Sequence, residues 1–82
     1  MNYLKADGFD AAIIGIDPHS ERVVYDIYKM IEICENWDMD EEVAIEYLEY
    51  NVFQAYVGPH TPIYIYPMDC EELERSINYF PQ

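Results

Sequence analysis

Basic residues are scarce in this sequence. Four Lys and Arg stand against seventeen Asp and Glu among 82 residues, which gives a formal net charge of −13 at pH 7. Direct binding to nucleic acid or to an anionic membrane depends on Lys and Arg side chains that neutralise phosphate. We therefore expect no direct nucleic-acid or membrane binding. The natural complement of this charge is a basic protein surface.

Long apolar runs and cysteine are also scarce. No run approaches the roughly 18 residues that cross a bilayer, and the first residues, MNYLKADGFD, lack the basic-then-apolar order of a signal peptide. Cys34 and Cys70 are the only cysteines, and one pair is a weak basis for a disulfide framework. These features favour a reduced, cytoplasmic location.

The motifs of the common catalytic sites are missing. Only three glycines occur, Gly8, Gly15 and Gly58, and they are too far apart for a phosphate-binding loop. His19 and His60 have no paired Cys or His spacing that would complete a zinc site, and no serine or cysteine has the context of an activated nucleophile. We expect no enzymatic activity and no cofactor. An enzyme that uses His19 or His60 is the minor alternative.

One acidic segment has to be compared with a calcium loop. From Asp38 to Glu49, carboxylates occupy several ligand positions of an EF-hand. Val43 stands where that loop requires glycine for its sharp turn, and the residues that follow have helical periodicity. We interpret the segment as the acidic first turn of a helix and expect no metal site.

What the chain does contain is enough apolar sequence for a single domain over residues 1–82. Hydrophobic residues make up 51% of the chain and aromatic residues 16%, unlike the composition of disordered acidic chains. The apolar run of residues 11–17, closed by Pro18, predicts a strand. Residues 22–25 are β-branched and aromatic and predict a second strand, antiparallel to the first.

Helical periodicity follows the two strands. Asp26 can cap a helix over residues 27–36, and Asp40 can cap a second, longer helix that ends at Gly58 and Pro59. The buried stripe of the first helix is expected to contain Ile27, Met30, Ile31 and Cys34. That of the second is expected to contain Ala44, Ile45, Leu48, Val52 and Ala55.

A third strand is predicted over residues 61–67, where Tyr and Ile alternate between two prolines. Ile63 and Ile65 share one face, and Tyr64 and Tyr66 share the other, which we expect to be the outer face. Proline cannot donate to a sheet ladder, so this strand is expected at an edge.

A short terminal helix completes the expected α+β fold. Asp69 and Glu72 have the spacing of a capping box. The apolar residues of that helix are expected to be Leu73, Ile77 and Phe80. The prediction is a small three-stranded, mostly antiparallel sheet with two or three helices on one face, in the order ββααβα.

Carboxylates are concentrated on the second helix and the segment before it. Glu42, Glu46 and Glu49 share a helix face away from the apolar stripe. We name the whole group the acidic ridge; it consists of Glu35, Asp38, Asp40, Glu41, Glu42, Glu46 and Glu49. One interpretation is solubility. The other is mimicry, in which carboxylates spaced on the scale of nucleic-acid phosphates occupy a Lys- and Arg-lined groove.

Nine tyrosines are more than a core of this size can hide. Exposed Tyr64 and Tyr66, with Tyr47, Tyr50 and Phe53 beside the ridge, would supply aromatic anchors for a protein interface. The alternative is that several of these rings pack within the fold.

Several short motifs resemble a family of small uncharacterised bacteriophage proteins. The resemblance covers about residues 12–65, although Gln54 stands where the family has Gly. It is carried by Val24-Tyr25-Asp26, Met39-Asp40-Glu41-Glu42-Val43-Ala44, Asn51-Val52, Ala55-Tyr56, Gly58 and Thr61-Pro62. It implies a viral origin and an early or accessory role in the cytoplasm of an infected bacterium, where small acidic phage proteins often inhibit nucleic-acid-binding machinery.

Two hypotheses follow. In the first, a non-enzymatic inhibitor uses the acidic ridge, with Tyr64 and Tyr66, to bind a basic host protein that handles nucleic acid, such as a CRISPR or restriction effector. In the second, an accessory or assembly protein forms a homodimer or larger oligomer through the strand that carries Tyr64 and Tyr66.

Overall fold

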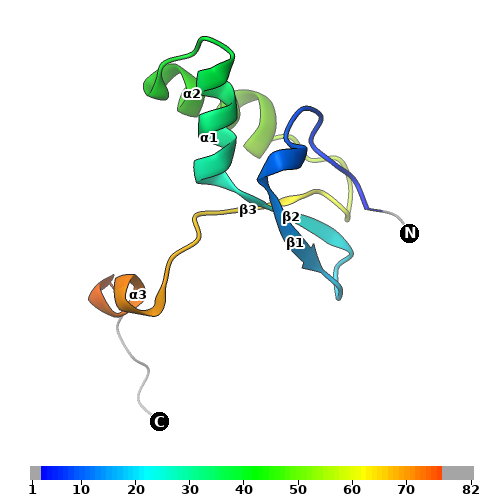
Figure 1. The fold of residues 1–82 in the computed structure, drawn as a ribbon. Coiled ribbons are helices and arrows are strands. Elements are labelled where there is room, and N and C mark those ends of the chain that lie inside the picture. Colours follow the sequence, from blue (N-terminus) through cyan, green and yellow to red (C-terminus); the bar gives the residue numbers. More distant parts are fainter. Residues whose placement is uncertain (1–2, 77–82) are drawn as a thin grey trace.

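In the part of the chain that the structure describes, three strands and three α-helices make up an α+β fold, in the order that the sequence predicts (Figure 1). The computed structural model describes residues 3–76. The strands are β1 (Ile13–Asp17), β2 (Arg22–Asp26) and β3 (Ile63–Ile65), and they form one sheet in the order β1-β2-β3. Within the described residues, no helix is long and apolar enough to cross a membrane.

The sheet is mixed. β1 and β2 form the predicted antiparallel hairpin. β3 pairs with β2 in parallel, with Tyr64 beside Tyr25. A parallel neighbour needs a crossover connection, and the helices between β2 and β3 provide it. The prediction that β3, with Pro62 and Pro67 on either side, lies at an edge is confirmed.

A polar turn closes the hairpin. The Asp17 carboxylate accepts hydrogen bonds from the Ser20 hydroxyl at 2.8 Å and from the His19 amide at 3.1 Å, and these bonds hold the pKa of Asp17 below its usual value. At the start of β2, Arg22 Nε donates to the Thr61 carbonyl. This bond ties β2 to the segment that leads into β3.

The first helix has the predicted bounds. α1 (Ile27–Asn36) begins after Asp26, whose Oδ1 accepts a hydrogen bond from the Lys29 amide at 3.3 Å. The first strand of the hairpin, β1, begins later than predicted, because a 3-10 turn, η1 (Asp10–Ala12), occupies its expected start and buries Ala12.

The second helix is capped as expected but is shorter. α2 (Glu41–Leu48) begins after Asp40, whose Oδ1 accepts a hydrogen bond from the Val43 amide at 2.9 Å. The prediction that the helix continues to Gly58 is wrong, since the α-helical pattern ends at Leu48.

The chain continues after α2 as one π-helical segment, η2 (Glu49–Phe53). Here the Asn51 side chain donates to the Tyr47 carbonyl at 3.1 Å, so it competes for an acceptor that an α-helix would use for its backbone. Beyond η2 the chain leaves the core, and Ala55, which was expected to be buried, is exposed.

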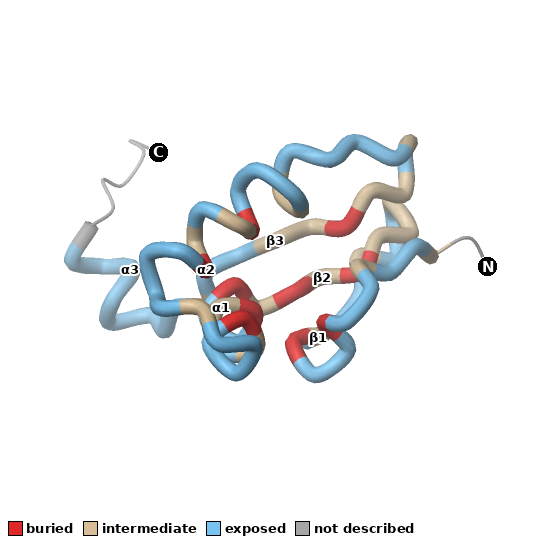
Figure 2. The backbone as a smooth tube through the Cα atoms, turned by 90° about the horizontal axis from the view of Figure 1, so that it is seen from above, coloured by how far each residue is buried: buried red, intermediate tan, exposed pale blue. Residues whose placement is uncertain are grey.

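The core lies between one face of the sheet and helices α1 and α2 (Figure 2). Val23 and Tyr25 alternate with half-buried neighbours on β2 and reach this core. Its buried side chains are Phe9, Ala12, Val23, Tyr25, Met30, Cys34, Ala44 and Leu48. Burial raises the pKa of the Cys34 thiol, which makes it a poor nucleophile.

The third helix, α3 (Cys70–Ser76), lies away from this core (Figure 1). Its predicted cap is present, because Asp69 Oδ1 accepts a hydrogen bond from the Glu72 amide at 2.8 Å. Helices α1 and α2 therefore cover the sheet without α3. The expected apolar residues Ile77 and Phe80 lie outside the described residues.

Candidate protein-interaction surface

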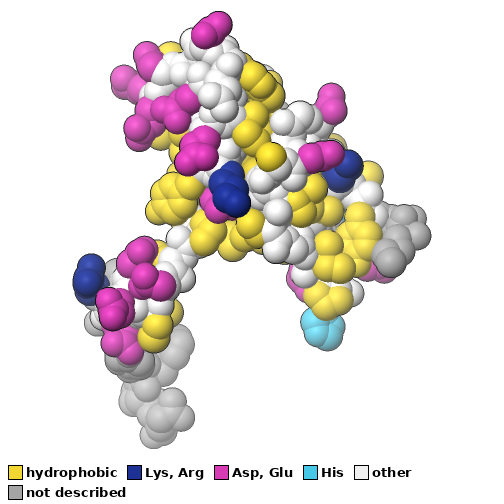
Figure 3. Space-filling view, in the orientation of Figure 1, with side chains coloured by type: hydrophobic (Ala, Val, Ile, Leu, Met, Phe, Trp, Pro, Cys, Tyr) yellow, Lys and Arg dark blue, Asp and Glu magenta, His cyan; other side chains and the backbone are white. Residues whose placement is uncertain are grey.

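The acidic ridge lies on the outside of the α1 and α2 pair. Glu35 is in the last turn of α1, and Asp38 and Asp40 are in the connector. The remaining members, on α2 and at the start of η2, are Glu41, Glu42, Glu46 and Glu49. All seven residues are exposed. Figure 3 shows Asp and Glu side chains gathered over this end of the molecule.

A tight turn joins the two helices that carry the ridge. Asp38 has a φ of 68°, in the left-handed region that Asp tolerates better than most residues. The amides of Asp38 and Met39 donate back to the Glu35 and Cys34 carbonyls, at 3.1 and 3.3 Å. These bonds close the end of α1 and place the start of α2 directly after it.

No cation neutralises the ridge within the described residues. The sequence has no Lys or Arg in residues 30–74, and the ion pair that the structure contains joins Lys5 Nζ to Asp10 at 3.0 Å, in the N-terminal segment. Glu42 and Glu46 are four residues apart on α2, and such like-charge pairs each cost about 0.2–0.5 kcal/mol. The ridge is therefore a surface of uncompensated negative charge.

Trp37 is an aromatic residue beside the ridge that the sequence pattern did not single out. Its ring lies 5.2 Å from that of Phe9, measured between centroids. The indole edge also covers Gly8, where an added Cβ would meet the Trp37 ring at 3.2 Å. The contact holds the connector against the N-terminal segment and leaves part of the Trp37 ring exposed next to Asp38.

The expectation that Tyr64 lies on the outer face is wrong. Tyr64 pairs with Tyr25, so both side chains lie on the face of the sheet that the helices cover. The Tyr64 ring lies 5.6 Å from that of Tyr25 and 4.9 Å from that of Phe53. Burial, with a smaller contribution from Tyr25, raises the pKa of the Tyr64 hydroxyl. Tyr64 is part of the packing rather than of an interface.

Tyr66 is exposed, as expected, but lies beyond the end of β3. Its ring is 5.0 Å from that of Tyr28 in the first turn of α1. Of the rings expected to flank the ridge, Tyr50 is 74% exposed, while Tyr47 and Phe53 are half-buried against the core. The sequence pattern did not indicate that Tyr28 and Trp37 are exposed aromatic residues, and the structure shows that they are.

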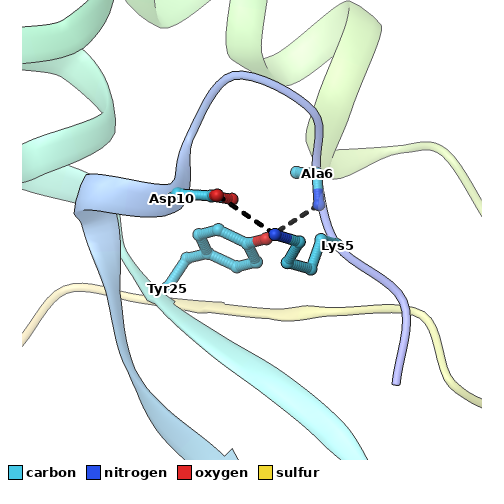
Figure 4. A network of polar contacts seen from close by, with 4 residues as sticks. All are labelled: Lys5, Ala6, Asp10 and Tyr25. Atoms are coloured by element: carbon cyan, nitrogen blue, oxygen red, sulfur yellow. Dashed lines mark hydrogen bonds and ion pairs between the residues drawn. The ribbon is translucent and has the colours of Figure 1, made fainter. Parts of the chain in front are cut away.

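A polar network fixes the N-terminal segment to β2 (Figure 4). The hydroxyl of the buried Tyr25 accepts a hydrogen bond from the Ala6 amide at 2.7 Å. Lys5 and Asp10 form their ion pair close by. Burial is the largest influence on Tyr25 and raises its pKa. The hydrogen bond gives the buried Tyr25 hydroxyl a partner and holds the N-terminal segment against β2.

A hollow lined by residues of the N-terminal segment, η2 and the segment around β3 is small and apolar. Its volume is about 180 Å³, and Val52, Val57, Pro62 and Tyr64 are among its lining residues. Small-molecule sites are typically about 300–1,000 Å³. The hollow therefore falls short of a substrate pocket.

His19 and His60 both lie at the end of the sheet where the turn joins β1 to β2. The sequence did not indicate that they share this end. His19 is exposed in the hairpin turn, and His60 Nδ1 lies 3.2 Å from the Glu21 carbonyl in that turn. In residues 3–76, no group of three or more His, Cys, Asp and Glu side chains is placed to hold a metal ion.

Comparison with known proteins adds no further constraint: no family model, curated protein or solved structure matches the chain. The surface of the described residues is therefore the structural basis from which a function is inferred. Its main features are the exposed acidic ridge and the aromatic side chains around it.

Proposed function

We propose that this protein is a non-enzymatic binding protein whose acidic ridge docks onto the basic surface of a nucleic-acid-binding protein. The observation that carries the proposal is the exposure of all seven ridge carboxylates with no Lys or Arg in residues 30–74. A cationic groove built for phosphates is the protein surface most complementary to such a ridge.

The consequence of docking is inhibition. Carboxylates on neighbouring turns of a helix are about 5–6 Å apart, on the scale of successive phosphates, so the ridge would fill the groove in place of DNA or RNA. The resemblance to phage proteins directs this proposal toward a bacterial defence enzyme, such as a CRISPR or restriction effector.

Self-association through β3 is the weaker candidate. It depended on two outward tyrosines, and Tyr64 packs against Tyr25 instead. A second copy would also carry a net charge of −13, so the two chains would repel each other.

The proposal is tested by affinity capture from bacterial lysate at about 0.05 M and about 0.5 M salt, where screening differs strongly. The bait proteins are the wild type, a Glu42→Lys/Glu46→Lys ridge variant, and an Asp7→Lys/Glu74→Lys control with the same net charge, at two exposed carboxylates outside the ridge. We expect a nucleic-acid-binding protein to be retained at low salt by the wild type and the control. It should be lost at high salt and from the ridge variant. Equal capture by all three proteins at both salt concentrations would contradict the proposal.

A further inference from the structure

Tyr28 and Tyr66 form an exposed aromatic pair at the N-terminal end of α1. The register of the parallel strands explains it: Asp26, the cap of α1, lies beside Ile65, the last residue of β3. The next residues on each segment bring Tyr28 and Tyr66 together, with ring centroids 5.0 Å apart and planes at 58°. Tyr28 is 52% exposed and Tyr66 is 49% exposed, so much of this tyrosine pair faces solvent.

Carboxylates lie on both sides of the tyrosine pair. On α1, Glu32 and Glu35 follow Tyr28 by four and seven residues, so they share its helix face, and both are exposed. On the other side, α3 begins four residues after Tyr66 and carries exposed Glu71. Figure 3 shows hydrophobic side chains between the acidic groups of these two regions.

The charge around the tyrosine pair identifies its occupant as a cation. A second copy of this chain would place its own carboxylates against Glu32. An apolar segment would leave Glu35 without a counter-charge, since residues 31–39 contain no Lys or Arg. Lys29, the nearest cation in sequence, follows Tyr28 directly and so projects about 100° around the helix from it.

We propose that the tyrosine pair is the anchoring site for an arginine side chain of a basic protein partner, with Glu32 accepting hydrogen bonds from the guanidinium. The inference rests on the proposed function, since it assumes a basic partner, and adds the residue that the partner inserts. Arginine suits the site better than lysine because its planar guanidinium stacks on aromatic faces while it donates to a carboxylate.

The test uses two blocked peptides of equal length and charge, one alternating Arg with Gly and the other Lys with Gly, titrated into the full chain and followed by NMR. We expect the Arg peptide to bind about two- to fivefold more tightly and to shift the ring signals of Tyr28 and Tyr66. Tyr28→Leu should abolish the preference for Arg, and Tyr28→Phe should retain it. Tyr56→Leu is the control, because it removes a more exposed ring away from this pair and should leave the preference unchanged.

The outcomes separate this inference from the proposed function. Equal affinities for the two peptides, with unmoved Tyr28 and Tyr66 signals, would overturn the arginine site and leave the ridge proposal standing. If Glu42→Lys/Glu46→Lys binds both peptides as the wild type does while Tyr28→Leu loses the preference, the ridge proposal fails and the arginine site stands. Absence of binding by either peptide at low salt would overturn both.

Discussion

The rings of Tyr25 and Tyr64 stack with centroids 5.6 Å apart, from paired positions on β2 and β3. This contact decides which face of the last strand belongs to the core. It also removes Tyr64 from the surface and leaves Tyr66 as the exposed tyrosine next to β3. The different environments of Tyr64 and Tyr66 can be measured directly.

Replacing Tyr64 with Ala should destabilise the fold far more than replacing Tyr66. The first substitution leaves a void against Tyr25 and Phe53, with an expected loss of about 2–4 kcal/mol in the free energy of unfolding. Tyr66→Ala removes a half-exposed ring and should cost about 1 kcal/mol or less. Urea denaturation measures both values, and equal losses would contradict the inward placement of Tyr64.

Tyr25→Phe should also be destabilising, although it keeps the ring. The Ala6 amide would lose the hydroxyl that accepts its hydrogen bond at 2.7 Å. Because the Ala6 amide is only partly buried, leaving it unpaired should cost about 1 kcal/mol, at the low end of the range for buried polar groups. Urea denaturation gives the loss, and hydrogen exchange of the Ala6 amide should accelerate. An unchanged exchange rate at Ala6 would show that this hydrogen bond does not hold the N-terminal segment.

Stability should fall as the pH rises above about 10. Burial raises the pKa of Tyr25 and Tyr64 above the usual value of 10.0. In the unfolded chain both hydroxyls lose their protons at the lower, usual pKa, so alkali favours the unfolded state. Urea midpoints at about pH 9 and about pH 11 should show the decline, and Tyr64→Phe should reduce it. A midpoint that is constant over this range would contradict the burial of these hydroxyls.

Asp40 caps α2 and also contributes a charge to the acidic ridge, and two substitutions can separate these roles. Asp40→Ala removes the acceptor for the Val43 amide and should cost about 1 kcal/mol in unfolding free energy. Asp40→Asn keeps the cap but removes the charge, so it should retain most of the stability while weakening any salt-sensitive association. Thermal denaturation of the two variants checks the first role, and equal melting temperatures for both would contradict it.

Local sequence signals predicted much of this fold. The bounds of α1 and the caps Asp26, Asp40 and Asp69 depend on neighbouring residues alone, and the structure has all of them. The acidic residues of α2 are exposed for the same reason, because helical periodicity assigns them to the polar face. Such features need no knowledge of the rest of the chain.

Features that depend on contacts between distant segments were not predictable in this way. Alternation along β3 indicates that Tyr64 and Tyr66 lie on the opposite face from Ile63 and Ile65. Which of the two faces meets the helices is set by the parallel register with β2. The Tyr28 and Tyr66 pair arises from that same register. The end of α2 at Leu48 likewise depends on the Asn51 side chain and on the path of the chain toward β3.

The most direct test of the central claim is displacement of nucleic acid from the captured partner. The partner is purified, bound to a labelled oligonucleotide, and titrated with the wild type or with Glu42→Lys/Glu46→Lys while fluorescence anisotropy is recorded. We predict that the wild type releases the oligonucleotide and that the ridge variant does not. An oligonucleotide that stays bound while the wild-type protein is also bound would contradict phosphate mimicry by the acidic ridge.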